Sequence, residues 1–490
     1  MARQIEKVAV IDVGSNSIRM VIYERSGGAL LPYFNEKTMA ALGRDLGQTG
    51  HLNPDGVSLA LETFRRFQAI LSSFGIQKVF AVATAAVREA TDGEAFRRAA
   101  EQVLGVELRV LSGIEEGHLA AQGVALGLAG ANGLVADLGG TSLELCPVRP
   151  DRVTPGETYA LGPLARFEDD HLSLGKRRKL IRKILAQSDL LPVEGGQLYA
   201  VGGAWRNLAA VNMRLTGYPL GVIHATVLRR EDLHRVIEAA QGARAHKAIR
   251  LELQQVAKKR YRSLLHATLV LDGLLHQSGL SEAKVSAYGL REGVAIDALG
   301  LAVANCLEDT AELYLRLTEP SRAFGRALTG FISPVTDGLK LPPDLIRVAC
   351  LMADSGARMH PDHRAELVFD QILRAPVPGL DHPQRVEVAL AVAFRYSSNF
   401  HLPDELGRLI SHKARRRAEI LGTAMRLGGA FSGRSGRLLE RVSLDCSPGE
   451  LTLVVRAEDH EMVSETVRRR LRQLAGLLDR KARLRNLPIS

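Results

Sequence analysis

Two short loops with the same pattern constrain the fold of this chain more than any other feature of it. The first lies in VAVIDVGSNSIRMVIY, and the second, 125 residues later, lies in GLVADLGGTSLELCPV. Each loop joins two apolar segments of β-strand type through an Asp-x-Gly turn. A single copy would equally fit an ordinary Asp-Gly hairpin turn. Because two copies occur, each closing an apolar strand, we interpret the loops as parts of a ligand site.

The residue types in both loops favour a phosphate ligand. Glycine lets the backbone approach a ligand closely, and successive N–H groups in such a turn form an anion-binding concavity. Hydroxyl side chains supply further donors: Ser15, Ser17, Thr141 and Ser142. Asp12 and Asp137 begin the two loops, where a carboxylate can hold Mg²⁺, directly or through its waters, between protein and phosphate.

Turn signals and apolar spacing predict alternating strands and helices over the first 300 residues. We expect strands at Val8–Val13, Ile18–Tyr23, Val79–Ala83, Val106–Val110, Leu134–Asp137, Leu143–Val148, Val153–Ala160, Leu198–Val201 and Val285–Tyr288. We expect helices at Leu59–Phe74, from the capping box Thr91–Glu94 to Gly105, from the capping box Ser112–Glu115 to Gly127, and at Ala204–Met213. This alternation implies mixed sheets flanked by helices, and the repeated opening indicates a weak internal duplication.

The last third of the chain has a different character. Residues 305–430 have helical patterns almost throughout, and a turn at Ser447–Glu450 predicts a hairpin followed by a basic helix to about residue 485. The length of 490 residues corresponds to about three domains. We place them at 1–125, 126–302 and 303–490.

The composition of the chain indicates which kinds of partner and which cell compartment suit it. The net charge of +10 favours a polyanionic partner such as nucleic acid, polyphosphate, nucleotide or anionic lipid. Four basic clusters contribute, although each alone is most simply a solvated helix face: Lys176–Lys179, Lys258–Arg260, Arg415–Arg417 and Arg468–Arg470. Four scattered cysteines form no CxxC pair, so a reducing cytoplasm fits. We find no signal peptide and no apolar run near the ~20 residues of a membrane span.

Two adjacent glutamates precede the second loop. Glu115 occupies the third helical position of the Ser112 capping box, so its side chain can be occupied by the backbone. Neighbouring helical residues point about 100° apart, which leaves Glu116 as the freer carboxylate. Glu116 could therefore accept a proton from water. The simpler alternative is that both glutamates only favour the helix N-terminus electrostatically.

Five further residues are candidates for phosphate or metal binding. Arg88 follows a strand end, where ligand-facing residues of α/β folds collect, although a surface ion pair is as plausible. Arg19 could neutralise phosphate or pair with a carboxylate. Glu144 could hold metal with Asp137 or face solvent. Gly202 and Gly203 form a third close-approach turn, which is also a common packing device.

A cluster of histidines and aspartates lies later in the chain, and it includes His360, His363 and His382 with Asp354, Asp362 and Asp381. A metal-binding His-Asp pair is absent, because Ala353 precedes Asp354. We interpret these residues as helix caps and surface histidines rather than as metal ligands.

Taken together, the motifs resemble those of the exopolyphosphatase and guanosine pentaphosphate phosphohydrolase family, within the actin and sugar-kinase superfamily. The segments that carry the resemblance occur in the order of the family: IDVGSNSIRM, VATAAVREA, LSGIEEGHLAAQG, ADLGGTSLEL, VGGAWRNLA and GLREGVA. The resemblance spans about residues 5–300. It implies two actin-like ribonuclease-H-type domains around a cleft, followed by a mostly helical HD-like domain and a small α+β C-terminal part.

The resemblance also implies a chemistry and a set of site residues. The general base would be Glu116, with Asp137 and Glu144 serving Mg²⁺, or Mn²⁺, and with a monovalent cation such as K⁺ as a further candidate. Arg88 would neutralise charge, and the residues holding phosphate would be Gly14, Ser15, Asn16, Ser17, Gly139, Gly140, Thr141 and Ser142. Asp12, Arg19, Gly202 and Gly203 are additional candidates.

Three residues depart from the family pattern, and none of them removes a carboxylate. Thr141 stands where a third glycine is usual, Leu143 where threonine is usual, and Gly117 where alanine follows the catalytic glutamate. Thr141 could add a donor but narrows the loop.

We therefore expect a cytoplasmic, homodimeric exopolyphosphatase that releases terminal orthophosphate from linear polyphosphate. The alternative substrate is guanosine pentaphosphate, which would be converted to guanosine tetraphosphate, and we expect neither a membrane nor a specific nucleic-acid partner. Two other classes stay open: a kinase of the same superfamily, and a polyanion-binding regulator that does not cleave.

Overall fold

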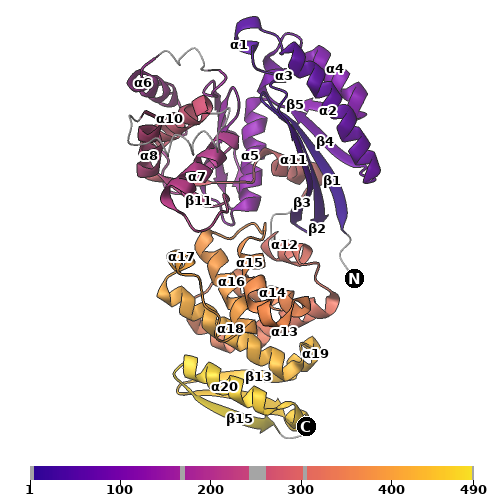
Figure 1. Cartoon of the computed structure of the whole chain (residues 1–490), viewed down its shortest axis with the longest axis vertical. Helices are drawn as coiled ribbons and strands as arrows, with labels where there is room; N and C mark the ends of the chain where they lie inside the picture. Colours follow the sequence, from indigo (N-terminus) through magenta and orange to yellow (C-terminus); the bar gives the residue numbers. More distant parts are fainter. Residues whose placement is uncertain (1–4, 166–171, 242–260, 302–305, 488–490) are drawn as a thin grey trace. The chain divides into compact units, whose positions relative to one another are not determined.

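The computed structural model describes residues 5–165, 172–241, 261–301 and 306–487. The chain forms two compact units, Gln4–Ala304 and Asn305–Ser490 (Figure 1). The first unit contains two sheets with helices, and the second unit is mostly helical with a small sheet near the C-terminus. The expected fold class is confirmed.

The first sheet has five strands in the order β3-β2-β1-β4-β5. These strands are β1 Glu6–Val13, β2 Ile18–Ser26, β3 Ala29–Thr38, β4 Lys78–Ala83 and β5 Leu108–Val110. β1, β2 and β3 are antiparallel neighbours, whereas β4 and β5 run parallel to β1. β1 is central and largely buried, which explains its continuous apolar sequence. Helices α2 (Pro54–Ser73), α3 (Ala85–Glu89) and α4 (Gly93–Leu104) complete this half.

The second sheet repeats this plan. Its strands are β6 Gly133–Leu138, β7 Leu143–Arg149, β8 Arg152–Val153, β9 Glu157–Tyr159, β10 Gln197–Val201, β11 Thr226–Arg229 and β12 Glu282–Val285. The order β7-β6-β10-β12 matches β2-β1-β4-β5 in position and direction. The predicted duplication is therefore visible as a repeated ribonuclease-H-type topology. Helices α6 (Leu174–Leu185), α7 (Gly203–Thr216), α8 (Arg230–Gln241) and α10 (Tyr261–Ser278) accompany this sheet.

Two strand predictions in this half are wrong in extent. The segment expected as one strand at 153–160 forms two short strands, β8 and β9. The strand expected at 285–288 ends at Val285. The Ser286 hydroxyl donates to the Tyr288 carbonyl oxygen and accepts the Tyr288 N–H, and these bonds turn the chain there.

Two helices join the halves of the first unit. α5 (Gly113–Gly127) follows β5, and α11 (Leu290–Leu299) follows β12, so they are equivalent in the repeat. They pack so closely that a methyl group built on Gly293 would lie 1.8 Å from the Leu119 carbonyl oxygen. A methyl group on Gly123 would lie 2.1 Å from the Gly289 carbonyl oxygen. Figure 1 shows both helices between the two sheets, and they position the site described below.

Helix ends follow the local sequence signals with one exception. The Ser112–Glu115 capping box forms as predicted. Asn53 caps α2, which begins at Pro54, earlier than the expected Leu59. The Thr91–Glu94 box is wrong: the helix begins at Gly93, and the backbone N–H of Thr91 donates to Gly50 in a neighbouring loop.

The second unit contains a helical part and a three-stranded sheet. The helices are α12 Cys306–Tyr314, α13 Glu319–Thr336, α14 Pro343–Met352, α15 Arg364–Leu373, α16 His382–Tyr396, α17 Asp404–Gly407, α18 His412–Ser432, α19 Gly436–Leu439 and α20 Glu465–Leu477. The predicted hairpin is confirmed as β13 Val442–Ser447 and β14 Glu450–Arg456. The basic helix does not continue to residue 485, because Asp479 turns the chain at φ 55° and β15 (Lys481–Leu487) pairs parallel with β14.

The histidines and aspartates noted in the sequence have different roles, as helix caps or as buried side chains. Asp381 forms a capping box with Gln384 at the start of α16. The His360 ring accepts the backbone N–H of Asp362. His382 is buried, so its prediction as a surface histidine is wrong. All four cysteines are free thiols. Among the described helices, none is both long and apolar enough to cross a membrane.

Candidate active site

The two Asp-x-Gly loops adopt the same turn. The N–H of Gly14 donates to the Ser17 carbonyl oxygen at 3.1 Å, and the N–H of Gly139 donates to the Ser142 carbonyl oxygen at 2.9 Å. One turn follows β1 and the other follows β6, which are equivalent strands of the two halves. The repeat in sequence is therefore a repeat in backbone geometry.

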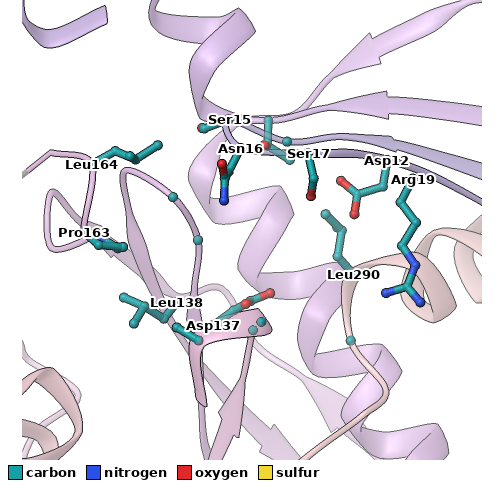
Figure 2. Close-up of a pocket in the computed structure, with 18 of the residues that line it drawn as sticks. Asp12, Ser15, Asn16, Ser17, Arg19, Asp137, Leu138, Pro163, Leu164 and Leu290 are labelled. Carbon is teal, nitrogen blue, oxygen red and sulfur yellow. The ribbon is translucent and has the colours of Figure 1, made fainter. Parts of the chain in front are cut away.

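The two turns meet in space. A methyl group built on Gly140 would lie only 2.9 Å from the Ser15 Cβ. Both turns line one pocket of about 620 Å³ in the first unit. Figure 2 shows Ser15, Asn16 and Ser17 on one side of this pocket and Asp137 with Leu138 on another.

Most of the predicted site residues line this pocket. They are Asp12, Gly14, Ser15, Asn16, Ser17, Arg19, Glu116, Asp137, Gly139, Gly140, Gly202 and Gly203. Four predicted residues are not part of the pocket wall: Arg88, Thr141, Ser142 and Glu144. Of these four, Arg88 and Glu144 influence the pocket indirectly, through their electrostatic interactions with Glu116.

Local structure separates the two glutamates as the sequence suggested. Glu115 accepts the N–H of Ser112 at 2.8 Å and pairs with Arg109 at 2.7 Å. Glu116 has an 8% exposed side chain, and its Oε2 is buried without a hydrogen-bond partner in the described part of the chain. A methyl group built on Gly139 would lie 3.9 Å from Glu116 Oε1. Glu116 thus faces the second turn as an unoccupied carboxylate.

Arg88 places a positive charge next to the Glu116 carboxylate. Its Nη1 donates to the Leu111 carbonyl oxygen at 2.6 Å and lies 3.7 Å from Glu116 Oε2. The expected alternative of a pair with Glu89 is also present, at 3.5 Å. Arg88 can therefore hold Glu116 in place, whereas contact with a ligand in the pocket would require its side chain to move.

Four carboxylates gather around the pocket and repel one another. Burial, followed by the charges of Glu144 and Asp137, raises the pKa of Glu116 well above its usual value. Burial raises the pKa of Asp137 to about 6. Burial and the charge of Asp137 raise the pKa of Glu144 to about 8. Burial also raises the pKa of Asp12, against the opposing charge of Arg291. The charges of Arg88, Arg206 and Arg291 oppose these shifts without cancelling the effect of burial.

The donor set fits a divalent cation that shares its coordination with a ligand. Glu144 Oε2 and Glu116 Oε2 are buried acceptors with no partner in the described chain. No group of three or more His, Cys, Asp or Glu side chains in that part is arranged to hold an ion alone. Mg²⁺ is commonly bound through one or two carboxylates, water and substrate phosphate, so this arrangement suits it.

Three arginines in the pocket were not predicted: Arg44, Arg206 and Arg291. Arg206 in α7 and Arg291 in α11 both line it. Burial, followed by the charge of Arg291, lowers the pKa of Arg206 to about 10. Arg291 lies 3.4 Å from Asp12 and so bridges the two halves. Arg206 and Arg291 each lie in the first turn of a helix whose N-cap is a glycine after a strand, and this signal in VGGAWRNLA and GLREGVA could have identified them.

Gly202 shows why glycine is needed at the third turn. Its φ is +113°, and a methyl group there would lie 2.5 Å from the Leu138 carbonyl oxygen and 3.3 Å from Asp137 Oδ1. A side chain at this position would clash with the backbone of the second loop and crowd the Asp137 carboxylate.

Two departures from the family pattern have local consequences. Thr141 does not alter the turn, which closes with the same hydrogen bond as the first loop, but its hydroxyl is buried and has no partner in the described chain. A methyl group on Gly117 would lie 3.1 Å from the Glu144 Cβ. Glycine at position 117 therefore lets Glu144 pack closely against α5.

Comparisons with known proteins show which sequences and folds this chain is similar to. A family model described as the Ppx/GppA phosphatase family matches residues 21–302, and one described as the C-terminal part of exopolyphosphatase matches residues 343–485. A crystal structure of the Aquifex aeolicus Ppx/GppA family member has a TM-score of 0.54 at 24% identity, covering 60% of this chain and 98% of that one. A crystal structure of an exopolyphosphatase from Cytophaga hutchinsonii has a TM-score of 0.53 at 19% identity, covering 61% and 99%. These structures are similar to this chain in fold.

Proposed function

We propose, because the chain belongs to the Ppx/GppA phosphatase family, that it hydrolyses the terminal phosphoanhydride of linear inorganic polyphosphate. The observation that carries this proposal is the contact of two phosphate-binding turns beside one unoccupied carboxylate, Glu116. Such a pocket can hold a single anionic chain end and present it to water.

The pocket has the groups to hold a multiply charged end. Backbone N–H groups of both turns and the hydroxyls of Ser15 and Ser17 can donate to terminal phosphoryl oxygens. Cationic side chains line the same pocket: Arg19, Lys37, Arg44, Arg206 and Arg291. Guanidinium groups suit phosphate because their donors form paired hydrogen bonds with its oxygens. Catalysis of phosphoryl transfer depends mainly on such positioning and charge stabilisation.

Glu116 would orient a water molecule in line with the terminal phosphorus and accept its proton. A carboxylate whose pKa is raised by burial is a stronger base, once ionised, than one in water. The cation of Arg88, 3.7 Å away, favours the ionised form and holds the side chain toward the pocket. The water oxygen then forms a bond to phosphorus while the bridging oxygen leaves with the shortened chain.

Magnesium is part of this proposal. Bound Mg²⁺ would offset the charge of phosphoryl oxygens and polarise the phosphorus for attack. Asp137 would hold the ion from the pocket wall, with Glu144 behind it and Asp12 opposite as additional carboxylates. The mutual repulsion of these carboxylates, described above, would be relieved by a divalent cation.

Polyphosphate and guanosine pentaphosphate remain the two candidate substrates. The match of residues 343–485 to the C-terminal part of exopolyphosphatase supports polyphosphate. One observation favours the nucleotide: the pocket wall also includes apolar side chains, among them Met39, Pro163 and Leu164, that offer a surface to a purine ring. We rank polyphosphate first, because a polymer also explains the basic excess of the chain.

The deciding experiment measures orthophosphate release from long-chain polyphosphate and from guanosine pentaphosphate in parallel, with Mg²⁺. We expect a higher kcat/KM for polyphosphate. A higher kcat/KM for guanosine pentaphosphate would reassign the substrate. Binding of both compounds without release would identify a polyanion-binding regulator instead.

A further inference from the structure

The second unit contains a pocket lined by arginines that the proposed reaction does not use. We define the arginine pocket by Arg364, Arg395, Arg426, Arg434 and Arg470, together with Ala357 and Tyr396. It encloses about 370 Å³. We propose that this pocket is a second anion-binding site, which takes a compact inorganic phosphate such as pyrophosphate.

The positive charge in the pocket is poorly compensated. No acidic side chain is part of its wall. Asp354 accepts from Arg434 at 3.1 Å but is also bonded to the Ser321 hydroxyl, so it offsets one guanidinium at most. Burial lowers the pKa of Arg395, with Arg434 and Arg426 adding to the effect, and burial lowers the pKa of Arg470 to about 10. One buried arginine and three partly buried ones around one cavity favour an anionic occupant.

Arg395 is the central donor. It is 8% exposed, and its Nε is buried without a hydrogen-bond partner in the described part of the chain. The Nε of Arg364 is likewise buried and unpartnered there. Unmade hydrogen bonds of buried charged groups are costly, and a phosphate oxygen in the pocket would satisfy them.

The helix next to Arg395 leaves space for its guanidinium group. Gly429 lies inside α18, where a methyl group would lie 2.5 Å from Arg395 Nη2 and 2.9 Å from its Cζ. Glycine inside a helix costs about 0.5–1 kcal/mol relative to alanine, and here it provides the space for a guanidinium. Arg434 sits at φ 72°, a strained conformation for a residue with a side chain. Both features keep arginines pointed at one cavity.

The wall of the arginine pocket favours an inorganic ligand over a nucleotide. Apart from arginines, the described residues of its wall are Ala357 and Tyr396. The Tyr396 ring already has two guanidinium groups near it, with Arg364 Cζ at 5.6 Å and Arg395 Cζ at 5.2 Å from its centre. Little aromatic surface is left for a base.

In the two other basic clusters that the structure describes, at 176–179 and 415–417, arginines pair with carboxylates. Arg417 pairs with Glu387 at 2.8 Å, and Arg178 pairs with Asp272 at 3.4 Å. The cluster at 258–260 lies outside the described residues. Among the clusters noted in the sequence, the one at 468–470 contributes Arg470 to the arginine pocket.

The test is hydrogen exchange of the full-length protein with and without pyrophosphate, in the absence of Mg²⁺. We expect pyrophosphate to protect peptides from α16, α18 and α20. Because the readout is local, binding in the catalytic pocket is observed separately. A parallel titration with GDP separates inorganic phosphate from a nucleotide, and we expect weaker protection by GDP.

Four variants, one of them a control, complete the test. Arg395→Gln and Arg470→Gln should weaken this protection by roughly tenfold or more, the scale of a lost charged hydrogen bond. Gly429→Ala should weaken it as well, through displacement of Arg395, even though alanine favours the helix. Arg415→Gln, which changes an exposed arginine of the same helix, should not. Absent protection in the wild-type protein, or undiminished protection in both folded Arg395→Gln and Arg470→Gln, would overturn the proposal; tighter protection by GDP would overturn the inorganic assignment.

Discussion

Ser15 and Gly140 lie in contact across the pocket, although 125 residues separate them in the chain. A methyl group on Gly140 would lie 2.9 Å from the Ser15 Cβ and 3.4 Å from its Oγ. The contact brings together the Asp-x-Gly turns of two equivalent half-domains. Real Cβ contacts are rarely this short, so even alanine at position 140 must displace the first loop.

The first prediction follows from this contact. Gly140→Ala should lower kcat/KM for polyphosphate by roughly 10- to 100-fold, because a misplacement of about 1 Å at a reacting group can cost 10²-fold. Steady-state phosphate release measures it. Gly175→Ala is the matched control, because a methyl group there meets no atom within 4 Å. Equal loss in both variants would show that the close contact is not the cause.

The second prediction concerns the proposed base. Glu116→Gln should lower kcat by roughly 10²-fold or more, the scale of a lost general base, while the fold is retained. Single-turnover phosphate release measures the loss in rate, and circular dichroism checks that the fold is retained. Glu115→Gln is the control, because Glu115 is occupied by Ser112 and Arg109 and should keep near-normal turnover. Full activity of folded Glu116→Gln would remove Glu116 from the mechanism.

The third prediction concerns pH and the capping box. Hydrogen bonds from Arg109 and Ser112 lower the pKa of Glu115 to about 2 in the folded protein. A lowered pKa stabilises the fold above the usual pKa of about 4.3 and loses that effect as pH falls toward the folded value. Wild type should therefore melt at a higher temperature than Glu115→Gln at pH 6, with a smaller difference near pH 3. The side chain is 44% exposed, which keeps the effect modest. A difference that grows with acid would contradict the assignment.

The fourth prediction tests an arginine that the sequence reasoning missed. Arg206→Met should lower kcat/KM by roughly 10- to 100-fold, since a hydrogen bond to a charged group contributes about 1.5–3 kcal/mol. Arg214→Met changes an exposed arginine on the same helix, α7, and should have little effect. An unchanged kcat/KM in Arg206→Met would place Arg206 outside the substrate site.

The fifth prediction tests the metal. Removal of divalent cations with EDTA should abolish phosphate release, and added Mg²⁺ should restore it. Asp137→Asn should raise the Mg²⁺ concentration for half-maximal activity by roughly tenfold or more. Asp151→Asn, at an exposed turn, is the control. Full activity in EDTA would exclude the proposed role of the ion.

Local sequence determined much of this protein. Glycine, Asp and Ser in fixed order specify each turn, and a capping box acts within one helical turn, so the separation of Glu115 from Glu116 could be predicted. The same holds for the strands around both loops and for the hairpin of the second unit. These features depend on neighbours within a few residues.

The tertiary structure decided what depends on distant contacts. Pairing with β14 turned the predicted end of a basic helix into β15, because a strand edge can override helix propensity. Contact between the two halves of the first unit brings Ser15 close to Gly140, and folding places Arg206 of α7 and Arg291 of α11 in one pocket. Burial raised the pKa of the carboxylates there. The arginine pocket likewise collects side chains from separate helices, because charge and space at a site are sums over residues that meet only after folding.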